Sequence, residues 1–139
     1  MNFPIVNGLR SIEFGTRGKM REELITLILN GRKRATAGIL EWDYRAQGEP
    51  LESVGERLAV LNSDGQHVAT IQVNEIEVIR FADVPDKFAL AEGEGDQSGD
   101  DFRASHLRYW SHGGFTVTDD TEIVLLYFDL VTKFDSQST

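Results

Sequence analysis

The sequence has no cysteine, and among its 139 residues it has only three histidines and three prolines. Without cysteine the chain has no disulfide partner, no thiolate nucleophile and no sulfur-ligated metal site. The histidines, His67, His106 and His112, lack the paired spacing of a zinc-binding helix, so we expect each to be structural or exposed. No Gly-x-Ser-x-Gly motif or phosphate-binding glycine loop occurs either. These absences exclude the commonest thiol, zinc and serine chemistries.

Long apolar runs are also missing, since none approaches the roughly 20 residues that cross a bilayer. The first six residues, Met1 to Val6, lack the charged and apolar regions of a signal peptide. We therefore expect no membrane partner and a cytoplasmic location.

Positive charge is scarce, and the formal net charge is −9. Residues 1–40 nevertheless hold seven Lys/Arg against three Asp/Glu, while residues 41–139 hold seven against twenty. Binding along a long nucleic acid requires many cations that meet phosphates, so this composition argues against it. A small, partly anionic ligand could still find a local positive site in the first part of the chain.

The length and the 40% hydrophobic content fit one globular domain. Apolar residues recur at helical spacing over 18–30, which predicts the first main helix. We expect an edge strand or a loop at Ser11–Gly15, an extended Thr36–Gly38 and a short helix over Ile39–Ala46. We place an N-terminal extension at 1–11, the domain at 12–132 and a polar tail at 133–139.

The middle and the end of the chain have sequence patterns that are typical of strands. Asp64-Gly65 predicts a hairpin between strands near 58–61 and 68–81, with a bulge at Asn74-Glu75. Ser98 and Asp101 resemble a capping box that opens the second main helix. Residues 123–128 are apolar on both faces, which is typical of a central strand. The expected fold is α+β, with a small, partly closed barrel flanked by two main helices.

The segment Gly31-Arg32-Lys33-Arg34-Ala35-Thr36-Ala37 holds three consecutive cations at the end of the first helix. One interpretation is structural, because basic side chains can satisfy the last helix carbonyls and the negative end of the dipole. The other is functional, with Lys33 and Thr36 projecting into one pocket.

A second candidate segment runs from Ala89 to Asp96, where three acids alternate with two glycines. If the segment is extended, Glu92, Glu94 and Asp96 point the same way. A calcium loop is excluded, because Gln97 stands where that pattern needs glycine and Arg103 where it needs an acid. Three interpretations stay open for the segment: a solvated acidic loop, a metal site of another kind, or a catalytic or ligand-binding carboxylate, for which Glu94 is the best candidate.

Four aromatic side chains could stack on a base or belong to the core: Trp42, Tyr44, Tyr109 and Trp110.

The two segments together resemble the signatures of ASCH domains, in particular the larger bacterial group. Gly31 to Thr36 is similar to their Gly-x-Lys-x-x-Thr signature, and Ala91 to Asp96 is similar to their second signature. The resemblance implies a small barrel like that of the PUA RNA-binding domain, and RNA or a modified nucleoside as the partner. Some small members remove the acetyl group of N4-acetylcytidine, and others have been described as ribonucleases.

Carried over by motif, the resemblance implies Lys33, Thr36 and Glu94 as catalytic residues, with no metal and no cofactor. We add five candidate ligand-binding residues: Arg32, Arg34, Trp42, Glu92 and Tyr109. The chain departs from the small enzymes in its added Trp42–Leu51 region and in Ala37-Gly38 after the threonine.

Two roles are open for Lys33. Nearby cations and burial favour a neutral amine that takes a proton from Thr36 or water, whereas an ion pair with Glu94 keeps the ammonium, which would stabilise an oxyanion. Two functions are also open, a metal-independent hydrolase and a non-catalytic RNA- or nucleotide-binding module.

Overall fold

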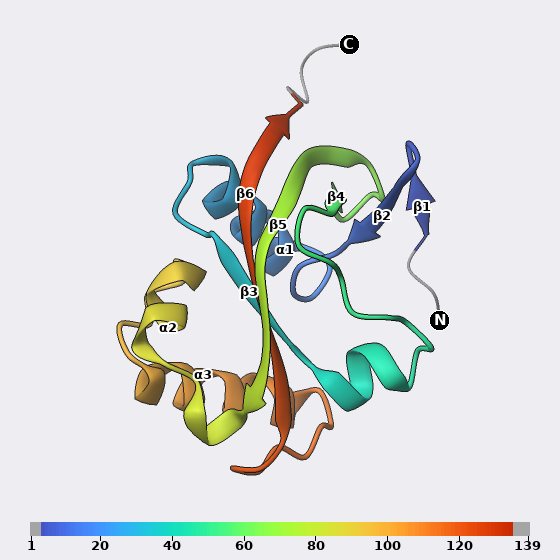
Figure 1. The fold of residues 1–139 in the computed structure, drawn as a ribbon. Helices are drawn as coiled ribbons and strands as arrows, with labels where there is room; N and C mark the ends of the chain where they lie inside the picture. Colours follow the sequence, from blue (N-terminus) through green and yellow to red (C-terminus); the bar gives the residue numbers. More distant parts are fainter. Residues whose placement is uncertain (1–3, 135–139) are drawn as a thin grey trace.

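The computed structural model describes residues 4–134 (Figure 1). Its strands are β1 Ile5–Val6, β2 Leu9–Ile12, β3 Ala35–Ile39, β4 Arg57–Leu61, β5 His67–Arg80 and β6 Glu122–Lys133. Its helices are α1 Lys19–Leu29, the π-helix η1 Leu40–Arg45, the 3₁₀-helix η2 Phe81–Asp83, α2 Asp86–Glu92 and α3 Gly99–His112. Within this part of the chain no helix is both long and apolar enough to cross a membrane.

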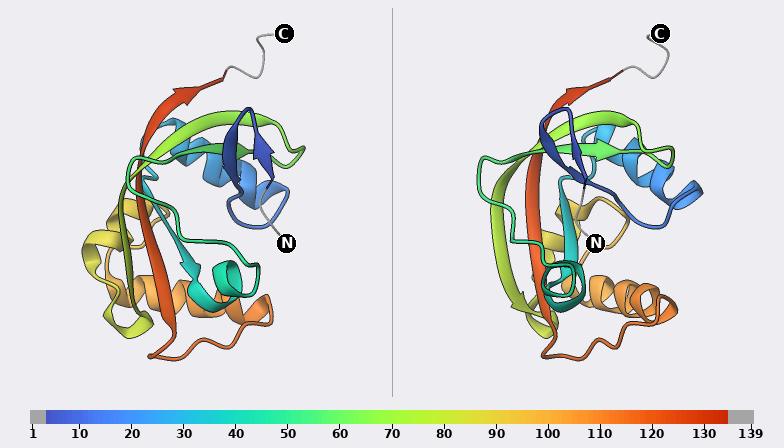
Figure 2. Two further views of the ribbon diagram at one scale, coloured as in Figure 1. Left: turned by 45° about the vertical axis from the view of Figure 1, so that its right-hand side comes forward. Right: turned by 90° about the vertical axis from the view of Figure 1, so that its right-hand side faces the viewer.

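All six strands form one sheet in the order β1-β2-β4-β5-β6-β3. The pairing is antiparallel except between β2 and β4. The expected hairpin joins β4 to β5, and the expected bulge shifts the register of β5 against β6 between Val73 and Glu75. The sheet is curved but open, because β1 and β3 are its two edges (Figure 2). The α+β class is therefore confirmed, whereas the partly closed barrel is not.

The helices pack at opposite ends of the long strands β5 and β6 (Figure 2). At one end α1 buries Ile28 in a cluster with residues of β4, β5 and β6. At the other end Phe88 of α2 and Phe102 of α3 pack edge to face, 5.5 Å between ring centres, against β3 and β6. Strand β3 connects the two ends, since it follows α1 and leads into η1 beside α3.

Most predicted elements are present, with some corrections. The first helix, the short helix after β3 and the Ser98 cap are confirmed; Ser98 Oγ accepts a hydrogen bond from Asp101 N–H at 3.1 Å. Ser11 and Ile12 belong to β2, which lies between β1 and β4 and so is not an edge strand, whereas residues 13–15 lie outside the strands, as the loop alternative expects. The extended interpretation of 89–96 is wrong, because α2 continues to Glu92. Part of the expected tail, 135–139, lies outside the described residues.

Candidate functional site

Lys33 lies in the short connection between α1 and β3. Helix α1 is followed by its cap residue Asn30 and then by Gly31. Gly31 has a φ of 82°, a conformation that glycine adopts readily. The next residues close the helix, since Arg32 and Lys33 both donate their N–H groups to Leu27 O at 3.0 Å. Backbone groups thus satisfy the helix end, which leaves the Lys33 side chain available for the interior.

Glu94 reaches the same place from the turn after α2. Gly93 ends this helix in the left-handed conformation, with φ of 69°. A Cβ atom on Gly93 would lie only 2.2 Å from Arg32 O, so the turn packs directly on the backbone that carries Lys33. A second link is the 2.7 Å hydrogen bond from Arg34 N–H to Ala91 O. The two signature segments are therefore held together by their backbones.

The Lys33 side chain is 2% exposed and is surrounded by oxygen atoms. Its Nζ lies 2.5 Å from Glu94 Oε2, 2.7 Å from Ala35 O and 3.5 Å from Glu92 O. Three acceptors require three N–H donors, which only the ammonium form provides. The close ion pair thus supports the charged role of Lys33 rather than the neutral amine.

Glu92 connects this pair to a histidine. It is 1% exposed, and its Oε2 lies 3.8 Å from Lys33 Nζ while its Oε1 lies 3.4 Å from His106 Nε2. The His106 ring stacks on Phe102 with 3.9 Å between centres. Burial alone would lower the pKa of His106, but its polar contact with Glu92 and the charges of Glu92 and Glu94 outweigh burial and raise it. Glu92 therefore lies between Lys33 and His106 and links the Lys33–Glu94 pair to the histidine.

These groups open into a cavity of about 240 Å³, here named the catalytic cavity after the role that the sequence analysis predicts for Lys33, Thr36 and Glu94. Lys33, Thr36, Glu94 and His106 all line it. The Thr36 hydroxyl makes no hydrogen bond to another described residue, so it is available to a ligand. The structure therefore brings together the three residues that the sequence selected as catalytic.

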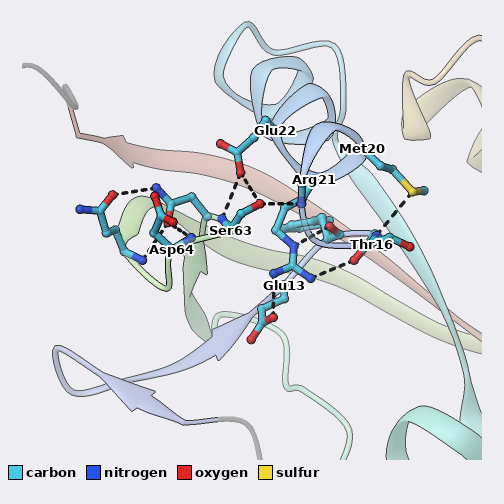
Figure 3. A network of polar contacts seen from close by, with 12 residues as sticks. Glu13, Thr16, Met20, Arg21, Glu22, Ser63 and Asp64 are labelled. Carbon is cyan, nitrogen blue, oxygen red and sulfur yellow. Dashed lines mark hydrogen bonds and ion pairs between the residues drawn. The ribbon is translucent and has the colours of Figure 1, made fainter.

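A buried arginine supports another part of the cavity wall, which includes Phe14 and Gly15. Arg21 of α1 donates to Phe14 O at 3.1 Å and to Gly15 O at 3.0 Å, and pairs with Glu13 at 2.9 Å (Figure 3). The same end of the helix is tied to the β4–β5 hairpin, where Glu22 accepts from Ser63 (Figure 3). This network fixes the wall without occupying the cavity.

The structure places the five candidate ligand-binding residues in different parts of the molecule. Glu92 and Tyr109 line the catalytic cavity, and the Tyr109 hydroxyl contacts Thr16 Oγ1 at 3.1 Å. Arg32 and Arg34 are exposed and line a separate open hollow. Trp42 is 45% exposed and packs on Phe115 at 5.5 Å, outside the residues that line the cavity.

His106 is the residue that sequence reasoning missed, because no paired spacing marks it as a ligand. The sequence offers only a weak indication of its position: His106 lies three residues before Tyr109 on the same helix, a spacing that places both side chains on one face. Glu92, Asp96 and His106 also offer ligand atoms within 4.8 Å of one another, close enough to hold a metal ion. The neighbouring Lys33 ammonium and the 2.8 Å hydrogen bond from Ser105 to Asp96 disfavour a cation there.

The fold and this cleft together define a PUA-like α+β domain with a buried lysine–glutamate pair. The chain belongs to the ASCH domain family, whose model matches residues 10–132. No curated protein matches the sequence.

Two solved structures are similar to the chain. An ASCH domain from Lactobacillus crispatus JV V101 has a TM-score of 0.76 and 28% identity, over 89% of this chain and 82% of the other. A protein from Enterococcus faecalis V583 has a TM-score of 0.75 and 26% identity, over 87% and 75%. The family is generally linked to RNA binding.

Proposed function

We propose that the protein is a metal-independent hydrolase that cleaves an amide of a modified nucleoside, of the N4-acylcytidine type. The observation that carries the proposal is the 2.5 Å contact between Lys33 Nζ and Glu94 Oε2 in a cavity that Thr36 also lines. A buried cation, a carboxylate and a hydroxyl without an internal partner are the groups that acyl transfer needs.

In the proposed reaction the Glu94 carboxylate takes the proton of the attacking hydroxyl group, which is that of Thr36 or of water. The new C–O bond turns the amide carbonyl into an oxyanion, and the Lys33 ammonium stabilises its charge. Collapse of this intermediate breaks the C–N bond, and Glu94 returns the proton to the leaving nitrogen. Attack by Thr36 gives an acyl ester that a water molecule then hydrolyses, whereas attack by water gives the free acid directly.

The activity test is incubation with N4-acetylcytidine, with the products identified by mass. Lys33→Ala and Glu94→Gln should each lower turnover by roughly 10²–10⁴-fold, the usual size of electrostatic and proton-transfer effects. Lys19→Ala is a matched control, since the side chain of Lys19 is 89% exposed. Products that both active-site substitutions leave unchanged would exclude this chemistry.

The second candidate function is a non-catalytic module that holds RNA or a nucleotide. Exposed Arg32 and Arg34 beside the same turn support it, since phosphates pair with arginine. Binding of single-stranded RNA without any product would favour the module, whereas RNA fragments would indicate a ribonuclease.

A further inference from the structure

A second cavity, here named the second chamber, adjoins the catalytic cavity and has no part in the proposed chemistry. Its volume is about 260 Å³, and it shares Phe14, Gly15, Thr36, Ala37, Tyr109 and Trp110 with the catalytic cavity. Each cavity alone is smaller than the ~300–1,000 Å³ usual for small-molecule sites, but together they fall within that range. Thr36 therefore stands at the junction of two parts of one cleft.

The far side of the second chamber is built by the region that follows β3. Gly38 of β3, Asp43 and Tyr44 of η1, and Glu52 of the next loop all line it. This is the added Trp42–Leu51 region with its immediate neighbours. The region thus gives the cleft extra depth beside Thr36.

Hydrogen-bond acceptors dominate this side. Glu52 is 8% exposed, and its Oε1 accepts from the Tyr44 hydroxyl at 2.9 Å. Burial raises the pKa of Glu52. Asp43 is exposed as a residue, but its carboxylate lies against Gly38 and accepts from Ile39 N–H at 2.7 Å. Local desolvation accordingly raises the pKa of Asp43 as well.

Cations are absent among the described residues that line the second chamber, whereas Glu13, Asp43 and Glu52 all line it. Arg21 pairs with Glu13 at 2.9 Å, and Arg10, which does not line the chamber, offsets only part of the effect of burial on the pKa of Glu52. The Ser11 hydroxyl, buried in the same wall, has no hydrogen-bond partner among the described residues. Such a wall accepts N–H groups and repels phosphate.

The remaining walls are aromatic, from Tyr109, Trp110 and Phe115. Aromatic faces beside hydrogen-bond acceptors suit a flat ring that carries N–H donors. A polyanionic chain has no counter-charge to meet in this chamber.

We propose that the second chamber binds the ring of an uncharged substrate that donates N–H groups, while the catalytic cavity holds the acyl group and Thr36 lies at the scissile amide. The assignment of the acyl side rests on the proposed function. The proposal that the second chamber binds an uncharged ring narrows the substrate class to free nucleosides or bases, in preference to their phosphates.

The test titrates ¹⁵N-labelled protein with cytidine, the uncharged ring product, and follows the backbone amide signals. The largest shifts are expected at Gly38, Tyr44 and Glu52. Shifts confined to Gly31–Arg34, or no shifts at millimolar cytidine, would overturn the proposal.

Two variants make the test specific to the second chamber. A Cβ atom on Gly38 would lie 3.3 Å from Asp43 Oδ2 and 3.4 Å from Tyr44 Cε2, so Gly38→Ala should weaken cytidine binding about fivefold. Glu52→Gln removes one carboxyl group without changing its size and should weaken binding about threefold. Glu23→Gln on the exposed face of α1 is the matched control, and equal affinities for all three variants would contradict the proposal.

Charge selectivity gives an independent readout. Cytidine 5′-monophosphate should bind at least about threefold more weakly than cytidine, and tighter binding would show that the acidic wall is not the binding surface. Failure of the proposed function is distinguishable, because wild-type protein without hydrolase activity would still show the cytidine shifts at the second chamber. Conversely, Glu94→Gln should lose hydrolysis and keep these shifts.

Discussion

Lys33 is buried, and its two carboxylate partners, Glu92 and Glu94, lie on another segment, so its replacement is costly. Removing one member of a buried ion pair leaves the other unpaired, at a cost of about 3–5 kcal/mol. Lys33→Met leaves Glu92 buried, although Glu94, with a side chain 24% exposed, can still reach water. We therefore expect a loss of roughly 2–4 kcal/mol in the free energy of unfolding, measured by urea denaturation.

The matched double variant identifies the cause of that loss. Lys33→Met combined with Glu92→Gln removes both buried charges, so it should be more stable than Lys33→Met alone. A double variant that is no more stable would show that the methionine disturbs packing instead.

His106 makes the stability of the fold depend on pH. Its pKa is raised in the folded state by Glu92 and Glu94, although burial opposes this. A histidine with a raised folded pKa stabilises the fold fully below its unfolded pKa of about 6.5, and this contribution is lost as pH rises through the folded value. Urea denaturation of wild-type protein should therefore show stability falling above pH ~6.5.

The control for this effect is a second histidine. His106→Gln should flatten the pH profile, whereas His112→Gln on the exposed end of α3 should leave it unchanged. An NMR titration that finds the His106 pKa at or below ~6.5 would contradict the argument.

At the residue scale the sequence predicted that Lys33, Thr36 and Glu94 share a site because two short motifs contain them, and the three residues do line one cavity. It could not identify His106, whose significance depends on Glu92 at the end of another helix. Apart from the motif, nothing in the sequence separates Lys33 from its neighbours Arg32 and Arg34. Only the turn that closes α1 and starts β3 decides which of these cations is buried.

At the element scale, the packing of two turns sets the geometry of the cleft. Gly93→Ala would place a methyl group against Arg32 O, where the available distance is 2.2 Å, so the turn must move and Glu94 with it. We expect a stability loss of roughly 2–5 kcal/mol from overpacking and strain, and a loss of turnover of about a hundredfold.

Gly95→Ala is the matched control for the Gly93 prediction. Gly95 also has a positive φ, of 104°, but a Cβ atom there meets nothing within 4 Å. Its replacement should carry only the strain of the backbone, about 1–3 kcal/mol, and keep most of the turnover. Equal turnover losses at the two glycines would mean that the contact with Arg32 does not position Glu94.

The sequence predicted those helices and strands that a local pattern specifies. The periodicity of α1, the serine cap of α3 and the Asp64-Gly65 hairpin are local signals, and all three hold. Helix α2 was missed because it is short and its hydropathy runs against its burial: apolar Leu90 is 57% exposed, whereas charged Glu92 is 1% exposed. The pairing of β2 with β4 is parallel and non-local, so no sequence window contains it.

At the scale of the whole molecule, charge separates the two candidate functions. The chain carries −9, and the cations beside the cleft, Arg32 and Arg34, line a hollow distinct from the two cavities. A ligand held in the cavities meets buried Lys33, hydrogen-bond acceptors and aromatic rings, whereas the phosphates of RNA would be held by exposed cations. Each phosphate contact releases a counterion, so the two modes respond differently to salt.

This difference leads to a direct prediction. Between 50 and about 500 mM NaCl, cytidine affinity should change less than about twofold, because no phosphate contact is involved. A module that binds single-stranded RNA through six to ten phosphates would lose about 10²–10⁴ in affinity between 50 and 200 mM. The measurement is calorimetric titration with cytidine and with a short single-stranded RNA at each salt concentration. Cytidine binding that weakens as steeply as RNA binding would place the ligand at the exposed arginines and not in the cleft, and the Lys33–Glu94 pair would then have no catalytic role with this ligand.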